Sequence, residues 1–371
     1  MISNNISARR QITSRFARYG AALALVAGIG AAFPAAEVES HQNAYRLHSL
    51  VSSSAAIPAN HVDANLVNVW GIVLAPNRPA WVSDGGTGLS TVYDGTGAPR
   101  TLVVTIPGGS PTGIVFNETG DFAIMGNSPT PVASSFLFAT ENGIIAGWNS
   151  AANTTNAITA VDSSAKGSVY KGLAMAATGT GNFLYATDFH NGRIDVFDKS
   201  FQPVAMASGA FTDPRLPTGF APFGIRNING NLYVTYAMQD AAAHDDVKGA
   251  GLGFVNVFDA SGKLIRRLAT RESLNAPWGL ALAPADFGKF SNMLLVGNFG
   301  DGRINAYDLA SGEFRGQLRG VGGAPLTIDG LWGISFGNGV QQQPVNALFF
   351  GAGPNGEAQG MYGRIEVMPQ P

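Results

Sequence analysis

Short segments in which apolar and polar residues alternate recur along the chain, separated by polar turns. The clearest pair is 182–188 and 193–198, which flank the turn Phe189-His190-Asn191-Gly192. Alternation with a period of two predicts strands with one buried face, and an Asn-Gly corner favours a tight reversal. The same arrangement recurs at 80–84 with 90–94, 232–236 with 254–259, and 294–298 with 303–308. The pattern therefore predicts a series of antiparallel hairpins.

A second pattern sets the fold, because one short phrase occurs six times. In each copy a glycine precedes an apolar residue at the start of a predicted strand, and four copies place an aromatic residue directly before the glycine. The glycines are Gly71, Gly113, Gly172, Gly224, Gly279 and Gly333, spaced 42, 59, 52, 55 and 54 residues apart. A period of about 50 residues is typical of one propeller blade. We therefore predict an all-β, six-bladed β-propeller of four-stranded antiparallel blades, forming a single domain over residues 37–371.

The two ends of the chain predict how the ring closes. The sixth repeat, 331–367, leaves no room for an outer strand, whereas 45–51 is a strand-like segment that precedes the first repeat. An open ring would leave two unpaired sheet edges, so we expect this N-terminal strand to complete the last blade. The second repeat stays ambiguous, because 122–125, 136–140, 144–148 and 157–161 supply one strand more than a blade needs.

Composition supports this fold and excludes several classes of protein. Charged residues make up 13% of the chain and there are 48 glycines, whereas globular proteins average about 25% charged residues and ~7% glycine. Few charges argue against a helical protein, and a net charge of −2 predicts no nucleic-acid partner. The absence of cysteine excludes disulfides, thiolate metal sites and cysteine nucleophiles. We expect a monomer.

Residues 1–36 predict an export signal. They hold Arg9, Arg10, Arg15 and Arg18 and no acidic residue, followed by the apolar run 21–32. That run is too short to span a membrane, which takes about 20 residues. The general secretory route fits better than the twin-arginine route, and an amphipathic presequence or a tail remains an alternative. We expect a periplasmic or extracellular protein with no membrane span after signal removal.

The repeats resemble NHL repeats, most closely at 181–198. The chain from about residue 45 to 367 resembles an uncharacterised family of exported bacterial six-bladed propellers, through Val69-Trp70-Gly71, 138–143, 146–149 and 169–174. This resemblance implies the propeller fold and export, and it implies no established reaction.

Candidate binding residues gather where the innermost strands begin, at the channel mouth. Trp70, Phe223, Trp278 and Trp332 occupy the same phrase position. They are candidates either to stack sugar rings or hydrophobic ligands, or to wedge between neighbouring blades. Lys171 replaces the aromatic residue in one blade and is a candidate to contact an anion.

The turns on the same face supply candidate metal ligands. The sequence resembles gluconolactonase-like propellers, which implies a tunnel calcium site built here from Asn68, Asp188, Asn298 and Asp329. Carboxylate and amide oxygens are the ligands that calcium prefers. The alternative is that the acidic and amide side chains at such turns bond the backbone of their own turn, which also applies to Asp84.

Two histidine-containing turns complete the candidates. His190, two residues after Asp188, is either a general base or zinc ligand, or an exposed turn residue. Residues 241–253, which include His244 to Lys248, lengthen the turn of the fourth repeat. Such an insertion forms part of a functional site or is a surface loop.

The sequence supports two hypotheses about function. The first is a platform that binds a small molecule, glycan or protein at the channel mouth. The second is a calcium-dependent lactonase or esterase acting at the central channel, with calcium as the candidate cofactor.

Overall fold

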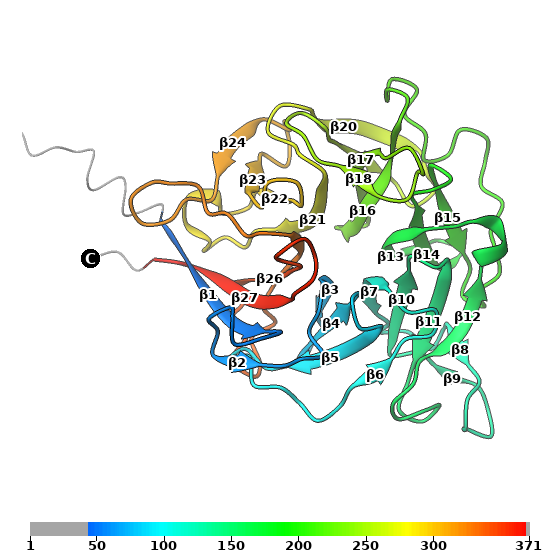
Figure 1. Cartoon of the computed structure of the whole chain (residues 1–371). Coiled ribbons are helices and arrows are strands. Elements are labelled where there is room, and N and C mark those ends of the chain that lie inside the picture. The colour runs from blue at the N-terminus through cyan, green and yellow to red at the C-terminus, as the bar shows by residue number, and fades with distance from the viewer. Residues whose placement is uncertain (1–43, 369–371) are drawn as a thin grey trace, which may run out of the picture. The chain divides into compact units, whose positions relative to one another are not determined.

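The computed structural model describes residues 44–368, which form six sheets arranged around a centre (Figure 1) and one further two-stranded sheet. The predicted export signal, residues 1–36, lies outside this range. The described residues contain two short 3-10 turns, η1 (Ser164–Lys166) and η2 (Gly288–Phe290), and no α-helix. None of their helices is long and apolar enough to cross a membrane. The predicted six-bladed, all-β propeller is confirmed.

The first three blades follow the repeats in order. Blade 1 contains β3 (Val69–Leu74), β4 (Ala80–Asp84), β5 (Leu89–Tyr93) and β6 (Val104–Thr105). Blade 2 contains β7 (Pro111–Phe116), β10 (Phe136–Thr140), β11 (Ile144–Trp148) and β12 (Ile158–Asp162). Blade 3 contains β13 (Tyr170–Thr178), β14 (Gly181–Asp188) and β15 (Arg193–Phe197). All pairings within these blades are antiparallel.

The last three blades complete the ring. Blade 4 contains β16 (Phe220–Ile228), β17 (Asn231–Gln239), β19 (Phe254–Phe258) and β20 (Leu264–Thr270), with β18 (Asp246–Val247) paired to β17. Blade 5 contains β21 (Pro277–Leu282), β22 (Leu294–Asn298), β23 (Ile304–Tyr307) and β24 (Phe314–Gln317). Blade 6 contains β25 (Leu331–Phe336), β26 (Leu348–Ala352), β27 (Met361–Val367), β1 (Tyr45–Ser52) and β2 (His61–Val62).

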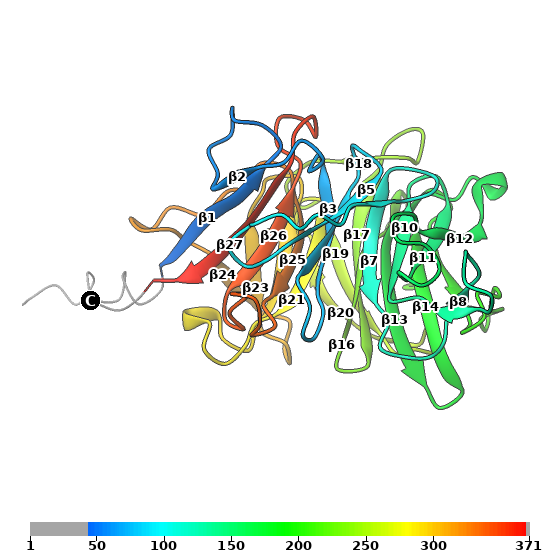
Figure 2. The ribbon, with the colours of Figure 1, turned by 90° about the horizontal axis from the view of Figure 1, so that it is seen from below.

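The N-terminal strand closes the ring, as predicted. β1 pairs antiparallel with β27, from Tyr45 opposite Val367 to Ser52 opposite Met361. Figure 2 shows the two strands side by side at one edge of the molecule. The buried Tyr45 hydroxyl donates a hydrogen bond to the Phe287 carbonyl oxygen at 3.0 Å, which ties the closing strand to blade 5.

Blades 4 and 6 each carry one strand more than the expected four, β18 and β2 respectively, and β2 is parallel to β1. Blades 2 and 3 differ in other ways. In blade 2 the extra segment forms a separate two-stranded hairpin, β8 (Ala123–Ile124) with β9 (Val132–Ala133), inserted between the first and second strands. In blade 3 the outer strand is reduced to an isolated bridge between Phe197 and Pro203. Beside this bridge the Val204 N–H donates a hydrogen bond to the Val196 carbonyl oxygen at 2.8 Å.

The phrase glycines mark the close approach of neighbouring innermost strands. A Cβ on Gly71 would lie 2.5 Å from the Thr112 carbonyl oxygen of the next blade. The same conflict recurs around the ring, with a Cβ on Gly333 lying 2.4 Å from the Trp70 carbonyl oxygen. Each innermost strand can therefore contact the next only because this position lacks a side chain.

Hydrophobic clusters fill the space between blades, so the core is distributed around the ring. Trp81 of blade 1, for example, stacks on Phe136 of blade 2 with ring centroids 4.1 Å apart. The central channel is what remains between the six innermost strands.

Candidate functional site: the channel mouth

Two sets of equivalent positions line one end of the channel, which we call the mouth. The first residue of an innermost strand pairs with the last residue of the second strand, as Tyr170 does with Asp188. The residues just before the phrase glycines are therefore close to those that follow the second strands. The first set is Trp70, Thr112, Lys171, Phe223, Trp278 and Trp332. The second set is Gly85, Glu141, Phe189, Phe299 and Gly353, together with Ala237, which follows the partner of Pro222 and lies inside the longer strand β17.

Six aromatic residues from these sets pack together in what we call the aromatic plug: Trp70, Phe189, Phe223, Trp278, Phe299 and Trp332. Trp332 stacks between Trp70 and Phe299, with centroid distances of 3.5 and 3.7 Å. The most exposed member, Trp278, is only 9% exposed. The four predicted aromatic residues thus meet at the axis, where Trp70 and Trp332 stack and the other contacts are edge-to-face.

Two indole N–H groups of the plug are hydrogen-bonded to other blades. Trp278 Nε1 donates to the Lys171 carbonyl oxygen at 2.9 Å. Trp332 Nε1 donates to Asn68 Oδ1 at 3.0 Å, and Asn68 Nδ2 donates to Glu357 Oε2 at 2.8 Å. Asn68 therefore links the plug to a carboxyl group on blade 6. These bonds fix the orientation of the rings, because a buried N–H without a partner is costly.

Lys171 lies on the plug and is the most deeply buried charge at the mouth. Its Nζ is 5.2 Å from the centre of the Trp70 ring and 5.9 Å from that of Phe189. The same ammonium forms an ion pair with Glu141 and a second one with Asp245, the latter at 3.3 Å. Its side chain is 2% exposed, so the two carboxylates and the aromatic faces replace its water shell.

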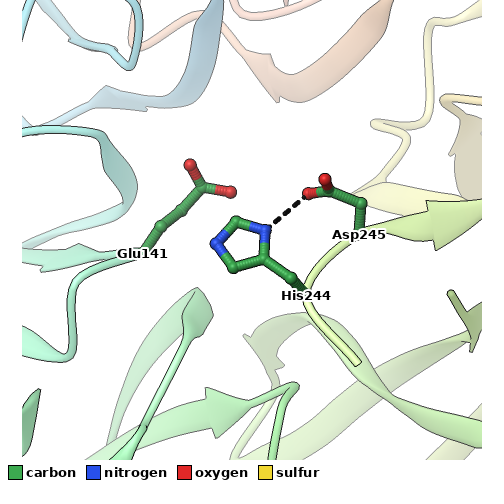
Figure 3. A group of neighbouring side chains, drawn as sticks. All are labelled: Glu141, His244 and Asp245. Carbon is green, nitrogen blue, oxygen red and sulfur yellow. Dashed lines mark hydrogen bonds and ion pairs between the residues drawn. The ribbon is translucent and has the colours of Figure 1, made fainter. Parts of the chain in front are cut away.

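The insertion in blade 4 reaches over the mouth. β18 pairs with the end of β17, with Asp246 opposite Gln239, which holds the loop in place. His244 Nδ1 lies 2.9 Å from Asp245 Oδ1, and Lys248 Nζ lies 3.9 Å from the centre of the Phe299 ring. Figure 3 shows Glu141 facing His244 and Asp245 from the opposite side.

The carboxyl groups of the mouth experience different environments. Burial raises the pKa of Asp246 to about 7, although the nearby Lys171 and Lys248 oppose the shift, and its Oδ2 is buried without a hydrogen-bond partner. Burial also raises the pKa of Glu357, against the hydrogen bond from Asn68. Burial acts to raise the pKa of Asp245 too, but the Lys171 ammonium and His244 together hold it below its usual value.

One group of mouth residues has the composition of a metal site. Single ligand atoms of Glu141, His244 and Asp245 all lie within 4.8 Å of one another. The Lys171 ammonium contacts both of these carboxylates. In this arrangement it supplies the positive charge that a metal ion would otherwise supply.

The four metal ligands expected from the gluconolactonase resemblance are engaged in other interactions. Asp188 accepts hydrogen bonds from its own turn, including Asn191 Nδ2 at 2.8 Å, and pairs with Arg193 at 3.2 Å. The exposed Asp329 accepts the Asn355 N–H at 2.8 Å. Asn298 donates to the Ser273 carbonyl oxygen at 2.8 Å and leaves its buried Oδ1 without a partner. Asn68 bonds Trp332 and Glu357, as described above.

The turn-bonding alternative therefore describes the geometry of Asp188, whose Oδ1 accepts the Asn191 N–H of its own turn at 3.3 Å, whereas Asp329 bonds the backbone of a different turn. His190 is exposed, and within residues 44–368 it forms no ion pair. Its carbonyl oxygen accepts a hydrogen bond from Gln239 Nε2 at 3.3 Å.

Sequence reasoning did not single out Glu141, Phe189, Phe299 or Glu357 as mouth residues. A signal was present for the first three, since each directly follows the last residue of a second strand. Aligning the repeats at that position isolates Glu141 as its one charged residue. Glu357 lies four residues further along its turn, and no repeat position identifies it.

Sequence comparison finds relatives of this chain among mimivirus proteins. The chain is 32% identical to uncharacterized protein R648 of Acanthamoeba polyphaga mimivirus over 332 residues, covering 86% of this chain and 80% of R648. The chain belongs to the R648 family. Uncharacterized protein L690 of the same virus is 33% identical over 302 residues, covering 78% of both chains. No protein family model matches the chain.

Solved structures similar to this R648-family protein are β-propellers. A virginiamycin B lyase from Staphylococcus aureus has a TM-score of 0.50 at 14% identity, covering 87% of this chain and 99% of the lyase. A protein of unknown function from Bacteroides thetaiotaomicron has a TM-score of 0.55 at 12% identity, covering 87% and 76%. At these identities the likeness concerns the fold alone. The curated relatives are mimiviral, so they give no support to the bacterial exported family implied by the sequence.

Proposed function

We propose that the protein binds the cationic group of a small polar ligand at the channel mouth. Four carboxyl groups, those of Glu141, Asp245, Asp246 and Glu357, lie around the ammonium groups of Lys171 and Lys248. The observation that carries the proposal is Asp246 Oδ2, a buried carboxylate oxygen with no hydrogen-bond partner. A buried acceptor of this kind is stabilised when a donor, above all a charged one, reaches it.

The environment of Asp246 gives the proposal a pH dependence. Because burial raises the pKa of Asp246 to about 7, its ionised form is costly without further positive charge nearby. A cationic ligand binds the ionised form, so we expect affinity to rise as the pH increases from about 6 to 8. An amine with a pKa well above this range keeps its own charge throughout.

Calorimetric titration with putrescine tests this proposal, with 1,4-butanediol as the uncharged control of equal length. We expect putrescine to bind and the diol to bind at least about tenfold more weakly, equivalent to about 1.4 kcal/mol. Asp246→Asn should weaken putrescine binding, whereas Asp162→Asn, at the exposed end of β12, should not. A diol that binds as well as the diamine, or an Asp246→Asn protein with unchanged affinity, would refute the proposal.

A metal-dependent hydrolase of the lactone or ester class is the second candidate, supported by the grouping of Glu141, His244 and Asp245. An imidazole ligand favours zinc over calcium, which prefers oxygen. Adding Zn²⁺ or Ca²⁺ to chelator-treated protein and recording the melting temperature tests it. A rise reversed by chelator, together with lactone hydrolysis, supports the hydrolase, and no response to either ion excludes it.

We also propose that the protein is exported, on the basis of the arginine-rich, apolar segment 1–36. Expression of the full chain in a bacterium, followed by fractionation and N-terminal sequencing, tests this. Export predicts a shortened protein outside the cytoplasm, whereas a full-length cytoplasmic product contradicts it.

A further inference from the structure

The channel contains a cavity on the side of the aromatic plug that faces away from the mouth. This cavity of about 520 Å³ is lined by the innermost strands of all six blades, and Trp278 of the plug forms part of its wall. Most of its lining is glycine or apolar, and the exposed residues Pro76 and Glu118 lie where β3 and β7 end. We call it the channel cavity. It is distinct from the polar mouth, which lies beyond the plug.

Four lining residues of this cavity are polar or charged, Glu118, Thr119, Arg226 and Asn227, and Arg226 is the one cation among them. The position two residues after each phrase glycine is occupied by Val73, Val115, Ala174, Arg226, Ala281 and Ser335. Arg226 is the one charged residue in this set. In five repeats the position is small or apolar, so strand packing alone does not account for an arginine in the sixth.

The guanidinium of Arg226 reaches from blade 4 to blade 6. Nη1 donates to the Ile334 carbonyl oxygen at 3.1 Å, and Nη2 donates to Ser335 Oγ at 3.1 Å. A guanidinium carries five N–H donors, and these two bonds leave others available to the cavity. The bonds also fix the plane of the group, which makes it a rigid binding element rather than a mobile surface chain.

No carboxylate of residues 44–368 forms an ion pair with Arg226. Glu118 lines the same cavity, but it is exposed at the rim. Burial among protein atoms lowers the pKa of Arg226, yet an arginine remains protonated at neutral pH. Arg226 is half-buried, and a charge that is partly shielded from water and has no counterion is stabilised when an anion joins it.

We propose that the channel cavity binds a small organic carboxylate with an apolar body, and that Arg226 is its anion-binding residue. The fork of the guanidinium matches a carboxylate, which accepts two parallel hydrogen bonds. The surrounding glycine and apolar wall favours a hydrocarbon body over a second charged group. The volume lies within the range of about 300–1,000 Å³ usual for small-molecule sites.

Titration of the full chain with octanoate tests this site, with 1-octanol and acetate as controls that lack the charge and the apolar body respectively. We expect octanoate to bind at least about tenfold more tightly than either control. Arg226→Gln should abolish this preference for octanoate over octanol. Arg315→Gln, at an exposed residue of the outer strand β24, is the matched control and should leave it unchanged.

A second variant distinguishes loss of the binding site from misfolding of the Arg226→Gln protein. Val73→Phe keeps Arg226 and fills part of the cavity, so we expect octanoate affinity to fall at least about fivefold while the circular dichroism spectrum is retained. A folded Arg226→Gln protein that still prefers octanoate would overturn the proposal, as would a wild-type protein that does not bind octanoate. Putrescine binding at the mouth is expected to be unaffected by saturating octanoate. Failure of the proposal for the channel cavity can therefore be distinguished from failure of the proposal for the mouth.

Discussion

The Trp70 carbonyl oxygen lies only 2.4 Å from where a Cβ on Gly333 would be placed. This contact joins the last repeat to the first, because β25 and β3 are the innermost strands of blades 6 and 1. The equivalent oxygen of Trp332 lies 2.5 Å from the corresponding point on Gly279. The ring is therefore built from one repeated backbone contact, and the same contact completes it.

Gly333→Ala tests this contact directly. The added methyl group would force the backbones of β25 and β3 apart, and overpacking of this kind costs about 1–3 kcal/mol. For a domain of this size we expect a fall in melting temperature of about 1–2 °C per kcal/mol. Gly120→Ala is the matched control, since a Cβ there would meet no atom within 4 Å. Equal melting temperatures for the two variants would contradict the role of the glycine.

The second prediction concerns β1, the strand that closes the ring. Removal of residues 37–51 deletes most of β1 and exposes the edge of β27 over Met361–Val367. An exposed edge pairs readily with other chains, so we expect aggregation or a markedly lower melting temperature by scattering and calorimetry. A chain lacking only residues 1–36 retains β1 and should melt normally. If the longer deletion melts at the same temperature as this control, β1 does not hold the ring closed.

The repeats made the architecture predictable, since each phrase glycine meets the same steric requirement. The site was less accessible to sequence reasoning. Glu141 and Lys171 come from different blades, and they meet only because the positions that carry them both face the axis. Likewise, the phrase pattern located Trp70 and Trp332 at one end of the channel, but their stacking depends on the width of the closed ring.

Asp84 provides a test of buried charge in blade 1. It is fully buried, its Oδ2 accepts a hydrogen bond from Thr91 Oγ1 at 2.8 Å, and its Oδ1 has no partner. Burial raises the pKa of Asp84 well above its usual value. The folded state therefore binds more protons than the unfolded state once the pH exceeds about 4, and the free energy of unfolding falls as the pH rises.

Asp84→Asn removes this dependence. We therefore expect the difference in the free energy of unfolding, variant minus wild type, to be at least about 1 kcal/mol more positive at pH 8 than at pH 4. Denaturant unfolding at several pH values measures the difference. Asp308→Asn should behave oppositely, because hydrogen bonds from its own turn lower the pKa of Asp308 and its ionised form stabilises the fold above about pH 4. A pH-independent difference between Asp84→Asn and wild type would show that the Asp84 carboxyl does not titrate differently on folding.

The pair of Lys171 and Glu141 gives the sharpest test of the mouth. Their side chains are 2% and 19% exposed, so removing one partner leaves a poorly solvated charge. Lys171→Met should destabilise the protein by about 3–5 kcal/mol, and adding Glu141→Gln should recover part of that loss. Lys166→Met, at an exposed lysine, should change stability little. If the double variant is instead destabilised by the sum of the two single losses, the two side chains contribute independently and Lys171 is held mainly by the aromatic faces of Trp70 and Phe189.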